Sequence, residues 1–336
     1  MSLQLPQADL PTSPSKPSQP QGVSRPLSYV AQASDYALLI YKNALLTVLT
    51  IGIYRFWGKT NKRKFIWSHL VLEGSRFQYT GTAKHLYMGF AKFVVPAFIL
   101  WVLIGNVIEL LVGNLALPIV AALVLFHWGL LFWAGFALRY LSLRYWISNT
   151  KFRGVHFRFG GNFSKYIKEA LIGSLFTLFT LGLYYPFLAA TNRKNLTEAI
   201  SFGPQKLSYS GKGWDLWYHY IIAFPLLLLT LGLYYPWHQA WLTKFHLHHT
   251  RYGKARLGSK ISGEDLFMPT IVGGALILFT LGLAYPFVSN WYRKTLFNSF
   301  RLRGPVDFEE IVNEAKQDSS AGGEALASFF DFDAGI

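Results

Sequence analysis

An eight-residue phrase recurs along this chain, and no other feature limits its fold as strongly. The phrase reads TLGLYYPF at 180–187, TLGLYYPW at 230–237 and TLGLAYPF at 280–287, and a looser copy, TIGIYRFW, stands at 50–57. The last three copies start fifty residues apart, and each ends a long apolar run. Self-similarity at a fixed period indicates that one structural unit has been copied.

The composition indicates a membrane protein. Of the 336 residues, 52% are hydrophobic and only 15% are charged, whereas soluble domains average about 25% charged residues. Four stretches contain no Asp, Glu, Lys or Arg: residues 110–138, 170–192, 216–243 and 266–292. Each stretch exceeds the roughly 20 residues that a helix needs to cross a bilayer, which makes buried helices of a soluble protein the weaker explanation.

We therefore predict an all-α polytopic membrane protein with about six transmembrane helices, built from internal repeats and carrying short strand-like elements in its loops. The candidate spans are 37–57, 87–112, 116–138, 169–190, 216–241 and 266–290. The strand-like elements read FQYTG at 77–81, FRFGG at 157–161, LSYSG at 207–211 and FRLRG at 300–304. Alternating apolar residues bounded by glycine are typical of a short half-buried strand.

The termini differ from the rest in composition. Residues 1–34 are rich in Pro, Ser and Gln, which is typical of a disordered tail. Residues 307–336 form an acidic tail with eight of the seventeen acids of the chain. The transmembrane domain is then 35–306, with no secretory signal peptide before it. The chain has no Cys, which excludes disulfides and thiol chemistry.

The basic residues predict a partner but leave the orientation open. A net charge of +15 beside apolar spans indicates contact with anionic lipid headgroups, and no soluble basic domain suggests nucleic acid. Five segments are basic: 55–86, 139–168, 191–215, 243–265 and 291–306. If every span crosses once, these segments fall on both faces, against the positive-inside rule. Alternatively the chain turns back at each phrase, since Gly and Pro permit a break. Single crossings are the favoured topology.

The repeated phrase supplies most of the candidate binding residues. Gly- or Pro-interrupted apolar segments at matching positions of repeats are typical of transporter binding sites. The candidates are Thr180, Gly182, Tyr184, Pro186, Thr230, Gly232, Tyr234, Pro236, Thr280, Gly282, Tyr285, Pro286 and His127. Close helix packing through small residues and interfacial anchoring by tyrosine are the competing explanations for the phrase.

Other polar residues give weaker signals. His127 could form a proton relay with Glu109, although a neutral histidine between helices explains it more simply. His238 and the cluster at 246–249 could bind a metal, but no nearby carboxylate supports this, so neither a metal nor another cofactor is predicted. The basic pairs that follow the phrase, such as 193–194 and 293–294, suggest headgroup or anionic-substrate contact. No catalytic motif is present, so no enzyme activity is predicted.

The phrase T-L-G-L-Y-Y-P-[FW], the basic pair after it and the later F-x-[FY]-x-G resemble the YjgN-like family of bacterial inner-membrane proteins. The segment SNTKFRGVHFRFGG at 148–161 is also similar to that family, and the resemblance covers roughly residues 35–305. It implies a multi-pass protein of the bacterial inner membrane. It implies no activity, because the family is a domain of unknown function. The chain departs from the pattern at Arg55, Phe56 and Ala284.

Two functions follow from these observations. The first is a module that binds or transports a small or amphipathic solute by gating at the interrupted helices. The alternative is a structural or lipid-interacting scaffold that organises partners through its basic face and acidic tail. An enzyme acting on lipid or envelope precursors comes third. The sequence leaves the substrate and the oligomeric state undetermined.

Overall fold

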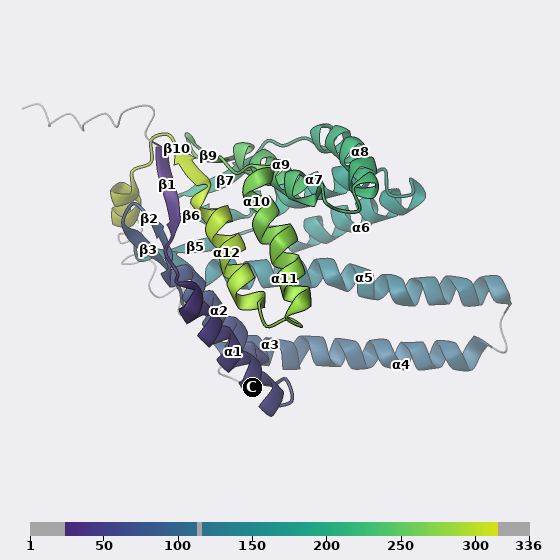
Figure 1. Ribbon diagram of the computed structural model, residues 1–336. Coiled ribbons are helices and arrows are strands. Elements are labelled where there is room, and N and C mark those ends of the chain that lie inside the picture. Colours follow the sequence, from purple (N-terminus) through teal and green to yellow (C-terminus); the bar gives the residue numbers. More distant parts are fainter. Residues whose placement is uncertain (1–23, 113–115, 315–336) are drawn as a thin grey trace, which may run out of the picture.

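Ten short strands form a closed antiparallel barrel at the centre of the computed structural model, which describes residues 24–112 and 116–314 (Figure 1). Around the barrel the order is β1-β10-β9-β8-β7-β6-β5-β4-β3-β2. The strands are β1 (Ser24–Tyr29), β2 (Leu70–Leu72), β3 (Ser75–Tyr79), β4 (Thr150–Phe152), β5 (Val155–Phe159), β6 (Ile200–Phe202), β7 (Gln205–Tyr209), β8 (Thr250–Tyr252), β9 (Ala255–Ser259) and β10 (Phe300–Arg303).

Two-residue turns join β2 to β3, β4 to β5, β6 to β7 and β8 to β9. At the first two turns both residues have positive φ: 48° and 72° at Glu73 and Gly74, and 49° and 84° at Arg153 and Gly154. This geometry matches the right-handed twist of paired strands and favours a tight hairpin. The first strand closes the barrel, because β1 pairs with β10 through residues 24–26 and with β2 through residues 27–29.

Between the hairpins, five helical excursions connect β1 to β2, β3 to β4, β5 to β6, β7 to β8 and β9 to β10. The outgoing helices are α1 (Ala33–Leu49), α3 (Ala83–Gly89) continuing through η1 (Phe90–Val94) into α4 (Val95–Val112), α6 (Phe163–Phe179), α8 (Gly213–Leu229), and α10 (Gly263–Phe267) continuing through η2 (Met268–Val272) into α11 (Gly273–Phe279). The returning helices are α2 (Arg55–Ser68), α5 (Leu117–Ser148), α7 (Tyr185–Glu198), α9 (Tyr235–His248) and α12 (Tyr285–Asn298). Each returning helix also packs against the outgoing helix of the next excursion.

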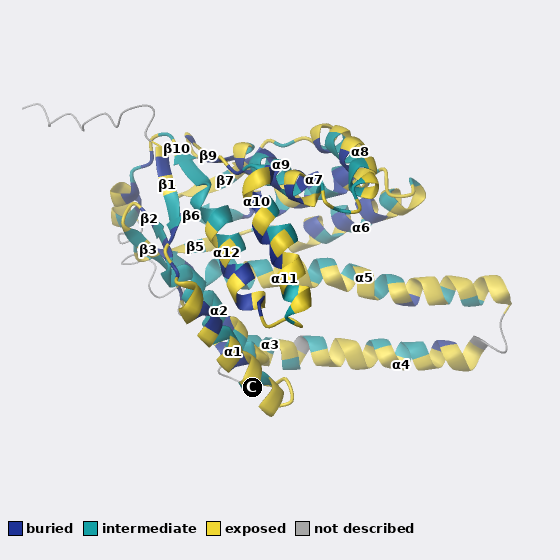
Figure 2. Ribbon diagram, in the orientation of Figure 1, coloured by how far each residue is buried: buried dark blue, intermediate teal, exposed yellow. Residues whose placement is uncertain are grey.

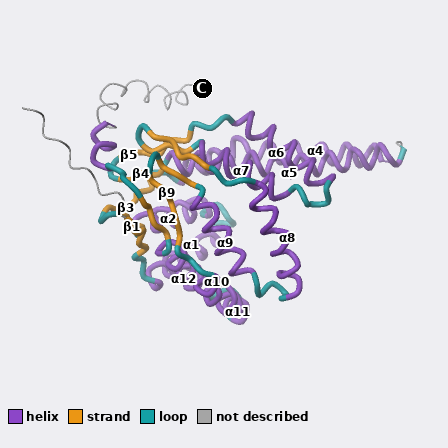
Figure 3. The backbone as a smooth tube through the Cα atoms, turned by 90° about the horizontal axis from the view of Figure 1, so that it is seen from above, coloured by secondary structure: helices purple, strands orange, loops and turns teal. Residues whose placement is uncertain are grey.

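All five excursions leave the barrel from one end. Successive strands of an antiparallel barrel run in opposite directions, so every odd-to-even connection lies at one end and every tight turn at the other. We call these the helical end and the turn end. Figures 1 and 3 show the helices spreading away from the strands on one side.

The repeated phrase forms the tip of four of these excursions. The Leu181 N–H donates to Leu178 O and the Gly182 N–H donates to Thr177 O, which together make a Schellman helix end. The Thr180 hydroxyl donates to Phe176 O and accepts the Tyr184 N–H at 3.0 Å. The next helix then starts with a proline in its first turn, where no N–H is required. The phrase is therefore a compact turn that ends one helix and starts the next.

The backbone of this turn has positive, left-handed φ angles at the same two positions in every copy. Leu181 has φ 50° and Gly182 has φ 94°; the other copies have φ 49° and 87°, 50° and 91°, and 51° and 89°. Glycine adopts such angles freely, but a left-handed L-residue costs about 1–2 kcal/mol. All four copies nevertheless have Leu or Ile at the first position. These residues are Ile51, Leu181, Leu231 and Leu281.

The barrel interior is packed with apolar side chains at its turn end. Phe152, Phe202 and Tyr252 end their strands at equivalent positions and meet in one buried cluster. Residues 305–314 cover this end, and Phe308 of the helical segment 308–314 packs edge-on against Phe152 at 5.3 Å. The buried Arg25 fixes the cover, because its guanidinium donates to Gly304 O and Val306 O and pairs with Glu73.

Within the described residues, two helices are long and apolar enough to span a membrane: Ala83–Leu111 and Leu117–Ser148. In their most apolar windows 0% and 6% of the residues are buried, whereas the core helix of a soluble protein would be mostly buried. Figure 2 shows both as largely exposed rods that project beyond the other helices.

The predicted all-α fold with six transmembrane helices is wrong. The strand-like loop segments are true strands that close a barrel, and only two described helices reach bilayer length. The other four candidate spans, 37–57, 169–190, 216–241 and 266–290, each contain a signature turn at which the chain reverses. Length and polarity missed this reversal because the turn residues carry no charge. At the termini, β1 lies within the predicted 1–34 tail, while residues 1–23 and 315–336 lie outside the described part.

The signature turn predicts opposite effects for two glycine substitutions. Gly182→Ala should destabilise the protein by about 1–2 kcal/mol, because the left-handed backbone disfavours a Cβ although space for it exists. Gly274→Ala, in the interior of α11 with equally open space, should stabilise it by about 0.5–1 kcal/mol. Thermal unfolding of the detergent-solubilised variants measures both. Equal melting temperatures would contradict the backbone explanation.

Candidate anion-binding cavity

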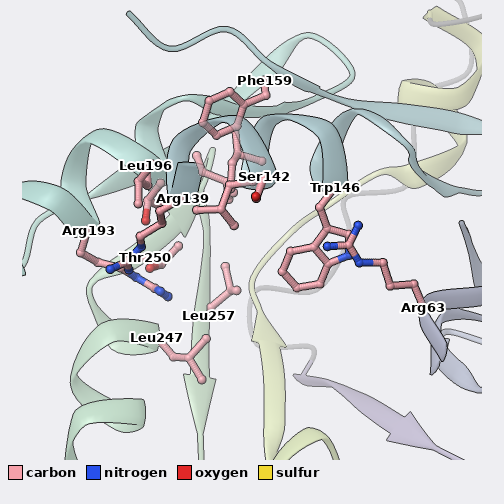
Figure 4. Close-up of a pocket in the computed structure, with 14 residues that line it drawn as sticks. Arg63, Arg139, Ser142, Trp146, Phe159, Arg193, Leu196, Leu247, Thr250 and Leu257 are labelled. Atoms are coloured by element: carbon pink, nitrogen blue, oxygen red, sulfur yellow. The ribbon is translucent and has the colours of Figure 1, made fainter. Parts of the chain in front are cut away.

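A cavity of about 410 Å³ lies at the helical end of the barrel, where the returning helices α2, α5, α7 and α9 meet the strands (Figure 4). Most of its wall is apolar. The lining residues are Arg63, Arg139, Ser142, Leu143, Trp146, Phe159, Arg193, Leu196, Thr197, Ile200, Leu207, Leu247, Thr250 and Leu257. The volume is within the range of pockets that hold a small ligand.

Three arginines give the cavity its charge. Arg63 comes from α2, Arg139 from α5 and Arg193 from α7, and no Asp or Glu is among the described residues that line the wall. Figure 4 shows the Arg139 and Arg193 side chains directed to the same side, near Thr250, with Arg63 beside Trp146 on the other side. The three arginines belong to three different excursions of the chain. They become neighbours only because the strands close into a barrel.

The environment of Arg193 favours an anion. The surrounding protein lowers the pKa of its guanidinium, and the neighbouring Arg139 lowers it further, while Tyr209 acts in the opposite direction. A guanidinium stays protonated in proteins, so two cations remain near each other here, although the Arg139 and Arg193 side chains are both exposed to solvent. A carboxylate or phosphate between them would relieve this repulsion with charge-assisted hydrogen bonds.

Aromatic residues hold Arg63 in place. Its Nη1 donates to Tyr79 Oη at 2.9 Å, and its guanidinium lies 5.6 Å from the ring centres of both Tyr79 and Trp146. These contacts fix the side chain without neutralising its charge. Trp146 itself lines the cavity, so its fluorescence can report on a bound ligand.

Tyr209 and His246, which lie near Arg193, also contribute no negative charge to the cavity. Tyr209 Oη lies 2.8 Å from His246 Nδ1. Burial raises the pKa of Tyr209 to about 12. Burial, together with Arg193 and His249, lowers the pKa of His246 to about 4. Both groups are therefore neutral at neutral pH, and the arginine charge is left for a ligand to balance.

Comparison with known protein families gives a match over most of the chain. A family model described as a bacterial protein of unknown function, DUF898, matches residues 24–228 and 226–329. The chain belongs to the DUF898 family. This confirms the resemblance to the YjgN-like family, which is the same family. No curated protein and no solved structure matches the chain.

In this DUF898 protein the predicted binding residues of the phrase do not form one site. Each copy closes a different helical excursion (Figure 1), and none of its residues lines the cavity. The Thr180, Thr230 and Thr280 hydroxyls all bond to backbone groups of their own turn. The remaining members fall in the same turns: Gly182, Tyr184, Pro186, Gly232, Tyr234, Pro236, Gly282, Tyr285 and Pro286.

His127 lies on α5 and packs between the two long helices. Its ring stacks on Trp101 at 4.5 Å, and it faces Gly105, where a Cβ would stand 3.1 Å from Nε2. Its Nδ1 is buried without a hydrogen-bond partner in the described structure. Within the described part of the chain no hydrogen bond or ion pair joins it to Glu109, so the structure supplies no relay between them.

The histidines at 246–249 point to separate partners. His246 meets Tyr209, His249 Nδ1 lies 2.8 Å from Phe245 O, and His238 Nδ1 lies 3.0 Å from His219 Nε2. Across residues 24–112 and 116–314, no group of three or more His, Asp or Glu is placed to hold a metal ion.

The sequence carries one signal of the cavity, in the basic residues that follow the phrase. Arg63 and Arg193 stand at the same offset from the signature threonine, as does Arg293, while the fourth excursion has Thr243 there. The second excursion lacks the phrase and has Leu143 at the equivalent distance before its strand. Arg139 and Trp146 follow no repeated pattern, so no sequence signal joins them to this set.

The neutral state of His246 predicts a pH dependence of stability. Its pKa is about 4 in the folded protein against a usual 6.5, so between these values the unfolded chain binds more protons. Stability is therefore lost as pH falls through this window. His246→Asn should melt with a smaller loss of stability between pH 6.5 and 4 than the unaltered protein. Parallel melting curves for the two proteins would contradict this assignment.

Proposed function

We propose that this DUF898 protein is a membrane-anchored module that binds an anionic amphiphile in the cavity at the helical end of the barrel. The observation that carries the proposal is the convergence of Arg63, Arg139 and Arg193 on an otherwise apolar wall without an acidic residue among its described members. Arginine matches the geometry of carboxylate and phosphate groups, and the apolar wall suits an acyl chain.

The anchor in this proposal is the pair α4 and α5. Both helices have the length and polarity of membrane spans, and few residues of their most apolar windows are buried. The chain would then pass twice through the bacterial inner membrane. The basic residues near the barrel favour a cytoplasmic position for the barrel under the positive-inside rule.

Binding is the part of the sequence-based hypothesis that the cavity supports. Gating at interrupted helices has no such support, because the signature turns are closed by their own hydrogen bonds and lie away from the cavity. The scaffold alternative needs no ligand in the cavity, and the same experiment separates the two.

Substituting a cavity arginine should weaken binding of an anionic amphiphile. We expect Arg193→Gln to reduce affinity for lysophosphatidylglycerol at least about tenfold, because a hydrogen bond to a charged group contributes about 1.5–3 kcal/mol. Titration followed by tryptophan fluorescence measures this in the full-length, detergent-solubilised protein, with lysophosphatidylcholine as the zwitterionic comparison.

The matched control is Lys194→Gln, which removes the same charge from the next, exposed residue of α7 outside the cavity wall. It should bind like the unaltered protein, and Arg193→Lys should retain part of the affinity. Equal affinity of Arg193→Gln and Lys194→Gln, or no preference for the anionic lipid, would reject the cavity as the binding site and favour a scaffold.

A further inference from the structure

The apolar side chains at the tips of the four signature turns are almost fully exposed on the surface of the protein. Ile51, Leu181, Leu231 and Leu281 are 94–95% exposed. The residues that precede the turns add to them, since Phe179, Leu229 and Phe279 are 80–84% exposed. All four turns project from the helical end, the end that also sends out α4 and α5 (Figure 2).

We propose that the four signature turns insert into the same face of the membrane that α4 and α5 enter, and that each dips into one leaflet and returns. The occupant of this surface is the lipid bilayer. The inference rests on the anchoring of α4 and α5 and is independent of the cavity.

The strained residue at each tip supports an apolar environment. A helix end of this type favours glycine at the left-handed position, yet the chain has Leu three times and a β-branched Ile once, each with φ near 50°. These side chains contact almost nothing within the protein, so the fold itself does not explain them. Burial of these side chains in lipid would stabilise the turns and offset the cost of their left-handed backbone.

The backbone of the turns is suited to a medium without water. An unsatisfied N–H or C=O is costly in lipid. In the turn at 180–187 the N–H groups of residues 180, 181, 182, 183, 185 and 187 all donate to backbone oxygens, and the proline at 186 has no N–H. The remaining one, at Tyr184, donates to the Thr180 hydroxyl. The other three copies repeat this pairing through Thr50, Thr230 and Thr280.

The length of the uncharged segments matches one leaflet. In the third excursion the uncharged part of the outgoing helix runs from 170 to 179. Ten residues of helix rise about 15 Å, which is half of the roughly 30 Å hydrocarbon core. The returning helix becomes basic at Arg193 and Lys194, close to the barrel. Charge thus reappears at the depth where anionic headgroups would lie.

A protein partner fits this surface less well. The tips are separate convex turns at the ends of splayed helices (Figure 3), whereas a protein interface needs one contiguous patch. A fluid bilayer accommodates separate tips, and the partly exposed Tyr185, Tyr235 and Tyr285 suit the interface just above them.

Single-cysteine labelling of the full-length protein tests the proposal directly, because the native chain has no cysteine. Leu181→Cys, Leu231→Cys and Leu281→Cys would each carry an environment-sensitive fluorophore. The labelled proteins are reconstituted in vesicles of phosphatidylethanolamine and phosphatidylglycerol that contain lipids with a nitroxide on the acyl chain. The matched control is Lys254→Cys, an exposed residue at the turn end of the barrel, and Leu125→Cys on α5 reports on the anchor.

The proposal expects a blue shift and strong quenching by the acyl-chain nitroxide at 181, 231 and 281, and neither at 254. Quenching at 125 without quenching at the three tips would overturn the inference and leave the anchor intact. Tips protected both from the lipid nitroxide and from aqueous iodide would show a protein partner and would also overturn it. Absence of quenching at 125 would reject the anchor and the inference together, without bearing on the cavity.

Discussion

The antiparallel pairing of ten short strands is the constraint on which the rest of this structure depends. Strands of three to six residues bury little surface alone, and β1 closes their ring by pairing with both β10 and β2. Because neighbouring strands alternate in direction, all five helical excursions must leave from one end. That single topological fact gathers the returning helices around one cavity and puts the signature turns and the two long helices at the same end of the barrel.

The same constraint explains the distribution of charge. If every apolar stretch crossed a membrane once, the basic segments would lie on both faces. In the structure each of the four signature turns sends the chain back, and α5 returns after α4, so all five basic segments lie beside the barrel. The reversal of the chain at each phrase is the second of the two chain paths considered from the sequence. The barrel end is therefore largely basic, and the far ends of the helices are apolar except for Arg55 in the first turn.

The sequence predicted local elements better than their assembly. Segments 77–81, 157–161 and 207–211 contain strands because their alternating pattern and bounding glycines act locally. The reversal at residues 180–187 escaped prediction, since its residues are as apolar as the helices around it. A left-handed Leu181 is also a position at which propensity alone would place glycine. The cavity was out of reach for a different reason: Arg63, Arg139 and Arg193 are far apart in sequence, and nothing local to them indicates that they meet.

Properties of adjacent residues can be read directly from the chain: it repeats one apolar phrase, basic residues follow the phrase, and the pattern resembles a bacterial membrane family. The folded protein adds that the phrase is a turn, that the loop strands form one barrel, and that three arginines line one cavity. These features depend on hydrogen bonds and contacts between residues many positions apart, and ring closure by β1 fixes them together.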